Sequence, residues 1–408
     1  MFFFVLLGVG LLKIGLVAWN KFQFNHYVGF VKRFPSSFLI VEKRLSGDAS
    51  LPEWLAERYS NPVLIANKHQ ILMLDGVLDV MIVQTEFSTL YKFKKTKIIM
   101  WQYGLAKEKY NYGEWRSLAS GILCYGDYSA KRFLKYAPSI SVGNLSFEST
   151  CMEPLDEGLV SFLDNEKKKI LYVPTWGDLS SVGMYLEYVC SNLSEKYCLI
   201  IKLHHNDISK FKNCEFVLSS SAYFLTGEYS VASLMSSVDV VISDYSGAIF
   251  DAVYFTKPLV LLNIHDKDLL ASEKIDLASL ECRRRSDIGV CVNDRKDLIC
   301  AVDSVASLLD SRSNIGDLVD DLYNHKLHDS ESIGSFLNDI VAGNLIKSRS
   351  QSSVEIAFRS KRSGERDISI LASRLKYFVM RYVYKFFPMK ISRVYKDEIS
   401  DGLDLVIR

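Results

Sequence analysis

The segment from Val238 to Asp251 constrains the fold of this chain more than any other. It begins with an apolar run broken only at Asp239, which indicates a buried parallel strand. A turn of small and polar residues, Ser243-Asp-Tyr-Ser-Gly247, comes next, and an apolar-periodic segment from Ala248 then indicates a helix. Because such an arrangement presents backbone N–H groups to an anion, it predicts a phosphate-binding turn in an α/β domain. The alternative is an ordinary capped helix.

Individual roles follow from residue size and position in this turn. Ser246 and Gly247 carry little bulk and can approach a phosphate closely. Asp251 lies within about two turns of the helix start, where it can reach a ribose hydroxyl. Ser243 and Asp244 are expected to shape the turn by bonding to nearby backbone groups. We expect no metal and no cofactor, because no His or carboxylate cluster has ligand spacing.

Two further strands end in polar residues that suit a nucleotide. Thr175 and Trp176 follow one strand and are expected to contact the base or the phosphates, with packing as the alternative for Trp176. Lys202 and His204 end the next strand, at the carboxyl edge where open α/β sheets bind ligands. There His204 can donate a hydrogen bond to a pyrophosphate oxygen and offset charge on the leaving group. His205 is expected to point to the opposite face.

The order of these segments closely resembles the CDP-glycerol glycerophosphotransferase family, whose members make teichoic acids and related capsule polymers. The resemblance runs from about Lys169 to Asn263 and rests on four segments: Lys169–Trp176, Leu199–His204, Ser233–Asp239 and Ser243–Gly247. It implies a GT-B fold, in which two Rossmann-like domains face each other and the C-terminal one holds the nucleotide. It also implies transfer of an alditol phosphate to a hydroxyl of a surface glycan or a lipid-linked acceptor, with release of CMP.

The first half departs from the family at one position. Many members carry a His-Gly-Thr-Pro-type loop ending in Lys, and the best match here, Met100–Lys107, places Gln102 where the His would be. An amide takes no proton at neutral pH, so Gln102 can orient an acceptor hydroxyl but not deprotonate it. His69, in another strand-end segment, is the visible candidate for the base, unless the reaction needs none or activity is lost. Lys107 keeps its place and is expected to face the acceptor or a phosphate.

Short apolar runs between polar segments predict a doubly wound sheet in the first half as well. The strand candidates there are Phe38–Val41, Val63–Ala66, Val80–Val83, Ile98–Met100, Ile122–Tyr125 and Ile140–Val142. We therefore expect an acceptor-side Rossmann-like domain over residues 31–160 and a donor-binding one over 161–345, joined by a polar hinge near 156–169. Residues 346–408 are expected to form a basic linker and an amphipathic tail.

The two ends of the chain raise the question of a membrane. Residues 1–30 begin with an apolar stretch to Trp19, interrupted only by Lys13, which is either a membrane anchor or a buried strand and helix of the first domain. Near the other end, residues 347–353 and 359–366 have the composition of linkers, and Ile368–Phe387 has the pattern of a basic amphipathic helix. That helix would lie on an anionic membrane or pack on the first domain.

Composition excludes several other classes. The formal net charge of +1 argues against a nucleic-acid partner, and eight scattered cysteines without a CxxC pair suit a reducing compartment. We expect a cytoplasmic protein at the inner face of the cell membrane, held peripherally or by its N-terminus, with a CDP-alditol donor. The alternatives are a GT-B glycosyltransferase that uses a nucleotide sugar, or a non-catalytic glycan-assembly protein, which Gln102 favours. The sequence leaves the oligomeric state open.

Overall fold

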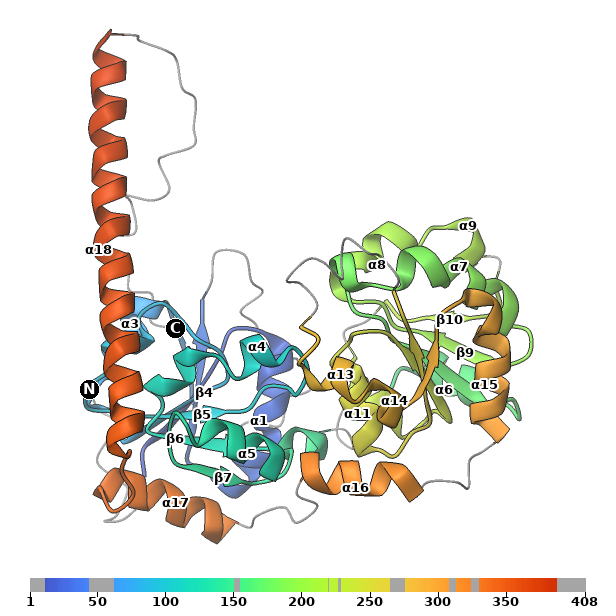
Figure 1. Ribbon diagram of the computed structural model, residues 1–408, viewed down its shortest axis with the longest axis horizontal. Coiled ribbons are helices and arrows are strands. Elements are labelled where there is room, and N and C mark those ends of the chain that lie inside the picture. The colour runs from blue at the N-terminus through green and yellow to red at the C-terminus, as the bar shows by residue number, and fades with distance from the viewer. Residues whose placement is uncertain are drawn as a thin grey trace. The chain divides into compact units, whose positions relative to one another are not determined.

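The computed structural model describes residues 12–43, 62–149, 155–218, 220–226, 229–264, 276–307, 313–323 and 330–386. The chain divides into two compact units, residues 1–355 and 356–408. Within the first unit the described residues form two parallel sheets, of seven and six strands (Figure 1).

The first sheet has the strand order β3-β2-β1-β4-β5-β6-β7. Its strands are β1 (Ile14–Ala18), β2 (Phe38–Glu42), β3 (Val63–Ala66), β4 (Val80–Val83), β5 (Lys97–Trp101), β6 (Gly121–Cys124) and β7 (Ser139–Ser141). The helices that follow these strands are α1 (Lys21–Arg33), α3 (Lys68–Leu72), α4 (Glu108–Asn111) and α5 (Asp127–Phe133), with 3-10 turns η1 (Leu90–Lys92), η2 (Glu114–Leu118) and η3 (Leu145–Ser149). All six predicted strands of this half are confirmed.

The second sheet has the order β10-β9-β8-β11-β12-β13. Its strands are β8 (Lys169–Tyr172), β9 (Cys198–Ile201), β10 (Tyr223–Phe224), β11 (Val240–Ser243), β12 (Leu259–Leu262) and β13 (Val290–Val292). The helices around it are α6 (Glu157–Leu163), α7 (Val182–Leu193), α8 (His205–Phe211), α9 (Glu215–Leu218), α10 (Val231–Met235), α11 (Ala248–Tyr254), α13 (Leu280–Arg283), α14 (Arg285–Ile288), α15 (Leu298–Ser307) and α16 (Ser313–Leu322), with 3-10 turns η4 (Gly177–Leu179) and η5 (Arg295–Asp297). Helix α6 occupies much of the stretch predicted to be a polar hinge.

Strands β1 and β8 are interior strands that pair on both sides. Leu16 of β1 lies opposite Leu39 of β2 and Ile82 of β4, and Leu171 of β8 lies opposite Ile200 of β9 and Val241 of β11. All of these pairs are parallel, so both faces of each sheet must be covered by helices. That requirement explains why the strands are continuous apolar runs rather than alternating ones.

The N-terminal segment is part of the first sheet, so a membrane anchor spanning residues 1–19 is wrong for the described part, residues 12–19. Here β1 is a fully buried strand in the interior of the sheet, followed by helix α1. Gly15 suits this packing, because a Cβ there would lie 2.7 Å from the side chains of Ile40 and Leu78. Residues 1–11 lie outside the described residues. No helix in the described parts of the chain is long and apolar enough to cross a membrane.

The predicted linkers near the C-terminus are also wrong. After helix α17 (Ser330–Ala342), a single helix α18 runs over Arg349–Phe386 and includes both polar stretches. Ser348 and Gln351 form a capping box at its start: the Ser348 N–H donates to Gln351 Oε1 at 2.8 Å, and the Gln351 N–H donates to Ser348 Oγ at 3.3 Å. The predicted amphipathic segment is the second half of this helix, up to Phe386.

Candidate functional site

The strand order of the second sheet places its switch point between β8 and β11. The chain continues from β8 toward β9 on one side and from β11 toward β12 on the other, so the connections diverge at this point. Open α/β sheets bind ligands outside the carboxyl ends of their strands at such a switch point. Thr175 and Trp176 follow β8, and the turn Ser243–Gly247 follows β11. The residues selected from the sequence therefore meet at one edge.

Asp244 joins the two strand ends. Its side chain is fully buried, and its carboxylate accepts the N–H of Thr175 at 2.8 Å and the N–H of Ser181 at 2.7 Å. Ser243 adds a bond from its hydroxyl to the Val173 carbonyl at 2.6 Å. Burial raises the pKa of Asp244, while the two backbone bonds act in the opposite direction. Both residues thus hold the shape of the turn, and their side chains point into the protein.

Arg285 completes this frame, and the sequence analysis missed it. Its guanidinium donates to the Asn263 side chain at 2.6 Å, to the Asp244 carbonyl at 3.0 Å and to the Leu262 carbonyl at 2.8 Å. It also lies over the ring of Tyr245, 4.3 Å from the centroid. The residue belongs to a run of three arginines, a pattern typical of a solvated surface, and only the fold brings it under the turn.

The turn keeps open space at its tip. Gly247 is exposed, and a Cβ built on it would have no protein atom within 4 Å. The hydroxyl of Ser246 accepts the N–H of Ala248 at 3.3 Å, at the start of helix α11. A ligand of phosphate size can therefore approach this backbone without displacing a side chain.

His204 and Trp176 stack beside this turn. Their ring centroids are 5.3 Å apart with an interplanar angle of 21°, and Trp176 is 49% exposed. The Asn206 N–H donates to His204 Nδ1 at 3.3 Å, which places the proton of the neutral imidazole on Nε2. Such a ring can present Nε2–H as a hydrogen-bond donor. Lys202 is half-buried at the end of the same strand, and the side chain of His205 lies outside the described residues.

Asp251 is placed differently from the other donor-side candidates. It lies on α11, partly exposed at its surface, and burial raises its pKa to about 7. Its charge also raises the pKa of Tyr103 and Tyr125 in the first half of the chain and of Tyr323 after α16, in each case after the larger effect of burial. The carboxyl therefore lies near tyrosines that follow the strands of the first sheet, as well as near the phosphate turn.

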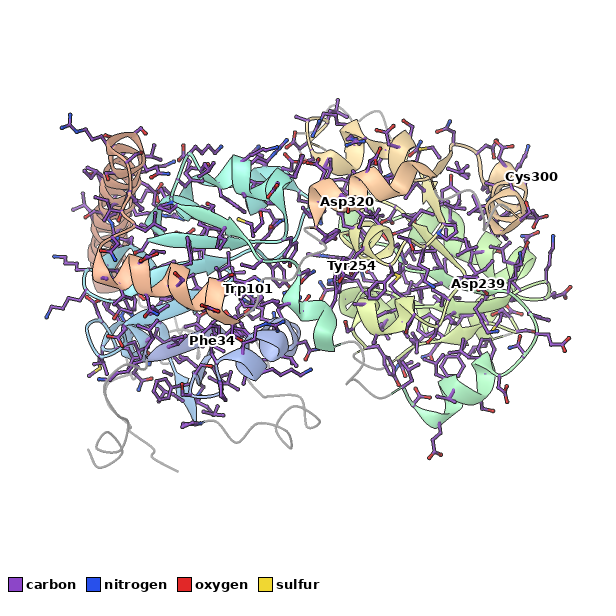
Figure 2. The ribbon with its side chains drawn as sticks, turned by 90° about the horizontal axis from the view of Figure 1, so that it is seen from below. Phe34, Trp101, Asp239, Tyr254, Cys300 and Asp320 are labelled. Carbon is purple, nitrogen blue, oxygen red and sulfur yellow. The ribbon has the colours of Figure 1, made fainter. Side chains whose placement is uncertain are left out.

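Helix α11 is in contact with the first half of the chain through aromatic rings. Phe147 in η3 packs on Tyr254, labelled in Figure 2, with centroids 4.0 Å apart. Tyr125 stacks on Tyr323 at 5.9 Å, and the Tyr323 hydroxyl donates to the Phe250 carbonyl at 2.9 Å. These contacts fix the helix that carries Asp251 against elements of the first sheet.

Gln102 is a buried structural residue. It follows Trp101, labelled in Figure 2, and is 0% exposed. Its amide nitrogen donates to the Gly104 carbonyl at 3.1 Å and to the Tyr112 hydroxyl at 3.5 Å, and its amide oxygen accepts the Tyr125 N–H at 2.9 Å. The amide is thus buried and bonded within the protein through both its nitrogen and its oxygen.

The two other first-half candidates lie apart from each other. His69 is exposed on α3, after the edge strand β3, four strands from β5 in the sheet order. At about 4.8 Å per strand, β3 and β5 are about 19 Å apart. Lys107 ends that loop with a φ of 57°, and its backbone N–H donates to Glu281 Oε1 at 2.7 Å. The next N–H, of Glu108, donates to Ser279 Oγ at 3.0 Å.

Two doubly wound parallel sheets, with a phosphate-type turn at the carboxyl edge of the second, define a protein of the GT-B class. Residues 160–315 match the family model described as CDP-glycerol:poly(glycerophosphate) glycerophosphotransferase. This match confirms, for these residues, the resemblance inferred from the sequence.

Known proteins support the same assignment. A 107-residue region is 29% identical to the teichoic acid poly(glycerol phosphate) polymerase of Bacillus spizizenii, covering 24% of this chain and 27% of the relative. A 98-residue region is 31% identical to the teichoic acid glycerol-phosphate primase of Bacillus subtilis, covering 23% and 25%. The chain thus matches about a quarter of the length of these curated relatives.

Solved structures agree on the fold. The wall teichoic acid polymerase TagF is similar over 83% of this chain and 91% of its own, with 16% identity and a TM-score of 0.53. The S. aureus MnaA–UDP complex is similar over 82% and 98%, with 13% identity and a TM-score of 0.55. At such identities the likeness shows the GT-B-type fold and no more.

Proposed function

We propose that this protein transfers glycerol phosphate, or another alditol phosphate, from a CDP-linked donor to a hydroxyl of a surface glycan or lipid-linked acceptor. The observation that carries the proposal is the family match over residues 160–315, which include the turn Ser243–Gly247 with its open tip. A TagF variant soaked with CDPG is among the similar structures. In this proposal the residues up to about 160 form the acceptor side and residues 161–345 the donor side.

The donor site works by positioning and by charge stabilisation. The turn at Ser246 and Gly247 binds the diphosphate through backbone N–H groups, and the exposed ring of Trp176 borders the same edge. His204 donates from Nε2 to the α-phosphate as negative charge develops on the departing CMP. Thr175 and Lys202 supply further polar contacts at the strand ends. Phosphoryl transfer asks little else of a protein.

Asp251 has a second role open to it besides a bond to the ribose. Its pKa of about 7 lets the carboxyl exchange a proton near neutral pH, and its charge acts on the tyrosines of the first half. We assign it to the boundary between donor and acceptor. Lys107 lies in the same boundary loop as Tyr103, and we propose that its ammonium faces the acceptor.

The test is the identity of the released nucleotide. The protein is incubated with CDP-glycerol, CDP-ribitol and a panel of nucleotide sugars, and the products are separated and weighed by mass spectrometry. Alditol-phosphate transfer releases CMP, whereas a glycosyltransferase releases a nucleoside diphosphate. Release of a diphosphate from a nucleotide sugar, with no CMP from any CDP-alditol, would refute the proposal.

A non-catalytic glycan-assembly role is the second candidate, because Gln102 replaces the family histidine and is fully engaged in the protein. This candidate predicts that CDP binds in calorimetry while no donor is consumed. Gly247→Val then serves as the control for specific binding in both experiments.

We also propose attachment to the inner face of the cell membrane through the C-terminal helix. In the unit that begins at residue 356, the side chains of Ile356, Ile368 and Leu371 on α18 are 65%, 70% and 67% exposed. Exposed apolar side chains among basic ones suit an anionic bilayer surface. Replacing the three by Ser should reduce co-sedimentation with phosphatidylglycerol vesicles; equal co-sedimentation of both proteins would contradict the attachment.

A further inference from the structure

The first sheet has a switch point of its own, between β1 and β4, and helix α1 begins there. Gln23 in the first turn of α1 spans this point. Its side-chain oxygen accepts the Trp19 N–H at 3.0 Å, and its amide nitrogen donates to Thr85 Oγ1, after β4, at 3.2 Å. By the same rule that locates the nucleotide in the second sheet, a ligand of the first sheet belongs beside α1.

Two buried side-chain atoms at this point have no hydrogen-bond partner among the described residues. Gln84, 1% exposed at the end of β4, donates through its amide nitrogen to the Gln23 carbonyl at 2.8 Å, which fixes the orientation of the amide. Its oxygen, Oε1, is buried and unpartnered, and so is Nδ1 of His26, one turn further along α1. Leaving such atoms unpaired costs about 1–3 kcal/mol each. An amide oxygen can only accept, so the missing partner must be a donor.

His26 lies against the loop that carries Gln102. Its ring stacks on Tyr103, the next residue, with centroids 5.1 Å apart and an interplanar angle of 28°. Burial lowers the pKa of His26 to about 4, so the imidazole is neutral near pH 7 and one nitrogen is free to accept. Tyr103 is 36% exposed, and its pKa is raised by burial and, to a smaller extent, by the charge of Asp251 on the donor side. The imidazole thus lies against the loop that the sequence predicts to border the acceptor.

We propose that the switch point at the start of α1, where Gln84, His26 and Tyr103 lie, binds a polyhydroxy acceptor, and that His26 takes the proton of the attacking hydroxyl. This inference rests on the proposed function. Gln84 Oε1 accepts a hydrogen bond from one hydroxyl of the acceptor. The unprotonated nitrogen of His26 accepts a hydrogen bond from a second hydroxyl, and this second hydroxyl is the nucleophile.

The step balances without a further reactant. The acceptor oxygen forms a bond to the β-phosphorus of the donor, while the bond from that phosphorus to the bridging oxygen breaks and its electron pair leaves with CMP. The hydroxyl proton passes to the imidazole of His26. A weak base suffices, because a loose phosphoryl-transfer transition state needs little deprotonation of the nucleophile. The anionic donor also raises the basicity of a nearby imidazole.

The first experiment needs no turnover. The full chain, labelled with 15N-histidine, is titrated with glycerol and with ribitol, and the imidazole resonances are followed by NMR, with His26→Gln supplying the assignment. The proposal predicts shifts at His26 that saturate, while the resonances of exposed His69 stay in place. Absence of a His26 shift, or equal shifts at both histidines, would overturn the polyol site.

The second experiment uses turnover. His26→Gln keeps a polar side chain but removes the base, so kcat should fall about a hundredfold while CDP affinity stays unchanged. Gln84→Met keeps the volume but removes the acceptor atom, so KM for the acceptor should rise about tenfold with a smaller change in kcat. Circular dichroism checks that both variants fold.

The outcomes separate this inference from the function on which it rests. If the wild type consumes no CDP-alditol, the proposed function fails, and the NMR titration alone decides whether the polyol site exists. If the wild type is active and both variants keep full kcat and KM, the inference is wrong. If His69→Gln abolishes turnover and His26→Gln does not, the base lies on α3 and the role of His26 is overturned.

Discussion

The two switch points of this molecule have the same topology but opposite states of hydrogen bonding. At β8 and β11, Asp244 uses both oxygens, Ser243 its hydroxyl and Arg285 three donors to hold the turn. At β1 and β4, Gln84 Oε1 and His26 Nδ1 are buried with no partner in the described chain. A turn that binds phosphate through its backbone must be shaped in advance by side chains. A site that binds hydroxyl groups must instead keep side-chain atoms available to form hydrogen bonds with the ligand.

The largest effect is expected at the turn Ser243–Gly247, at the switch point of the second sheet. Gly247→Val adds side-chain atoms where no protein atom lies within 4 Å, so the fold should survive while the phosphate is excluded. CDP affinity in calorimetry should fall by at least about a hundredfold, equal to about 2.7 kcal/mol. Gly316→Val is a matched control, since a Cβ at Gly316 on α16 also meets nothing within 4 Å. Equal CDP affinity in wild type and Gly247→Val would remove the turn from the nucleotide site.

The next effect concerns His204, at the neighbouring strand end. His204→Ala removes the Nε2 donor, and kcat should fall about a hundredfold because charge on the leaving group is no longer offset. Trp176→Ala, which removes only the stacked partner, should cost less in kcat and more in donor KM. Steady-state rates of CMP release measure both. Similar, small losses in the two variants would mean that the pair merely packs.

A smaller effect is expected at Gln102, near the switch point of the first sheet. Gln102→Met keeps the volume but leaves the Tyr125 N–H and the Gly104 carbonyl without partners, so the free energy of unfolding should fall by about 2 kcal/mol. Urea titration measures it. If the unfolding free energy is unchanged while kcat collapses, Gln102 acts on the substrate after all, and the comparison between the two switch points loses its basis.

The smallest effect is a pH dependence at the boundary between them. Folding raises the pKa of Asp251 from 3.8 to about 7, so the folded state binds its proton more tightly, and stability falls as pH rises across that window. This pKa shift can change the free energy of unfolding by at most about 4 kcal/mol. Because Asp251 is partly exposed, we expect a change of about 1–2 kcal/mol. Asp251→Asn should therefore be more stable than wild type at about pH 8, with the gap closing near pH 4. A gap that does not change with pH would show that the carboxyl is solvated.

The strands and the turn Ser243–Gly247 between β11 and α11 could be predicted because they depend on local pattern. A buried parallel strand must be an apolar run, and a backbone that approaches phosphate must have small residues. Val240–Ser243 and Gly247 can therefore be predicted from the sequence alone. The first nineteen residues were ambiguous, since the interior of a sheet and a bilayer select the same side chains. The Ser348–Gln351 capping box could have indicated α18, but basic and serine-rich composition suggested linkers instead.

The rest of the site depends on contacts between distant segments, which no local pattern records. His26 was included in the apolar N-terminal segment, and its nearness to Tyr103 appears only once β1 and β5 are placed in one sheet. In the sequence, Arg285 and Glu281 have the pattern of surface charges. In the fold, Arg285 bonds to the turn and Glu281 bonds to the Lys107 loop. The difference between Gln102 and the family histidine is a prediction from the sequence, whereas the bond from the Tyr125 N–H to Gln102 depends on the fold.

The left-handed backbone at Lys107 bears on how the halves of the molecule depend on each other. A residue with a side chain pays about 1–2 kcal/mol for this conformation, and here bonds from the 107 and 108 amides to Glu281 and Ser279 offset it. Glu281→Ala should accordingly speed hydrogen exchange at the Lys107 amide. The loop that carries Lys107 is therefore completed by atoms encoded more than 170 residues later. Neither half expressed alone would contain all the partners of this loop.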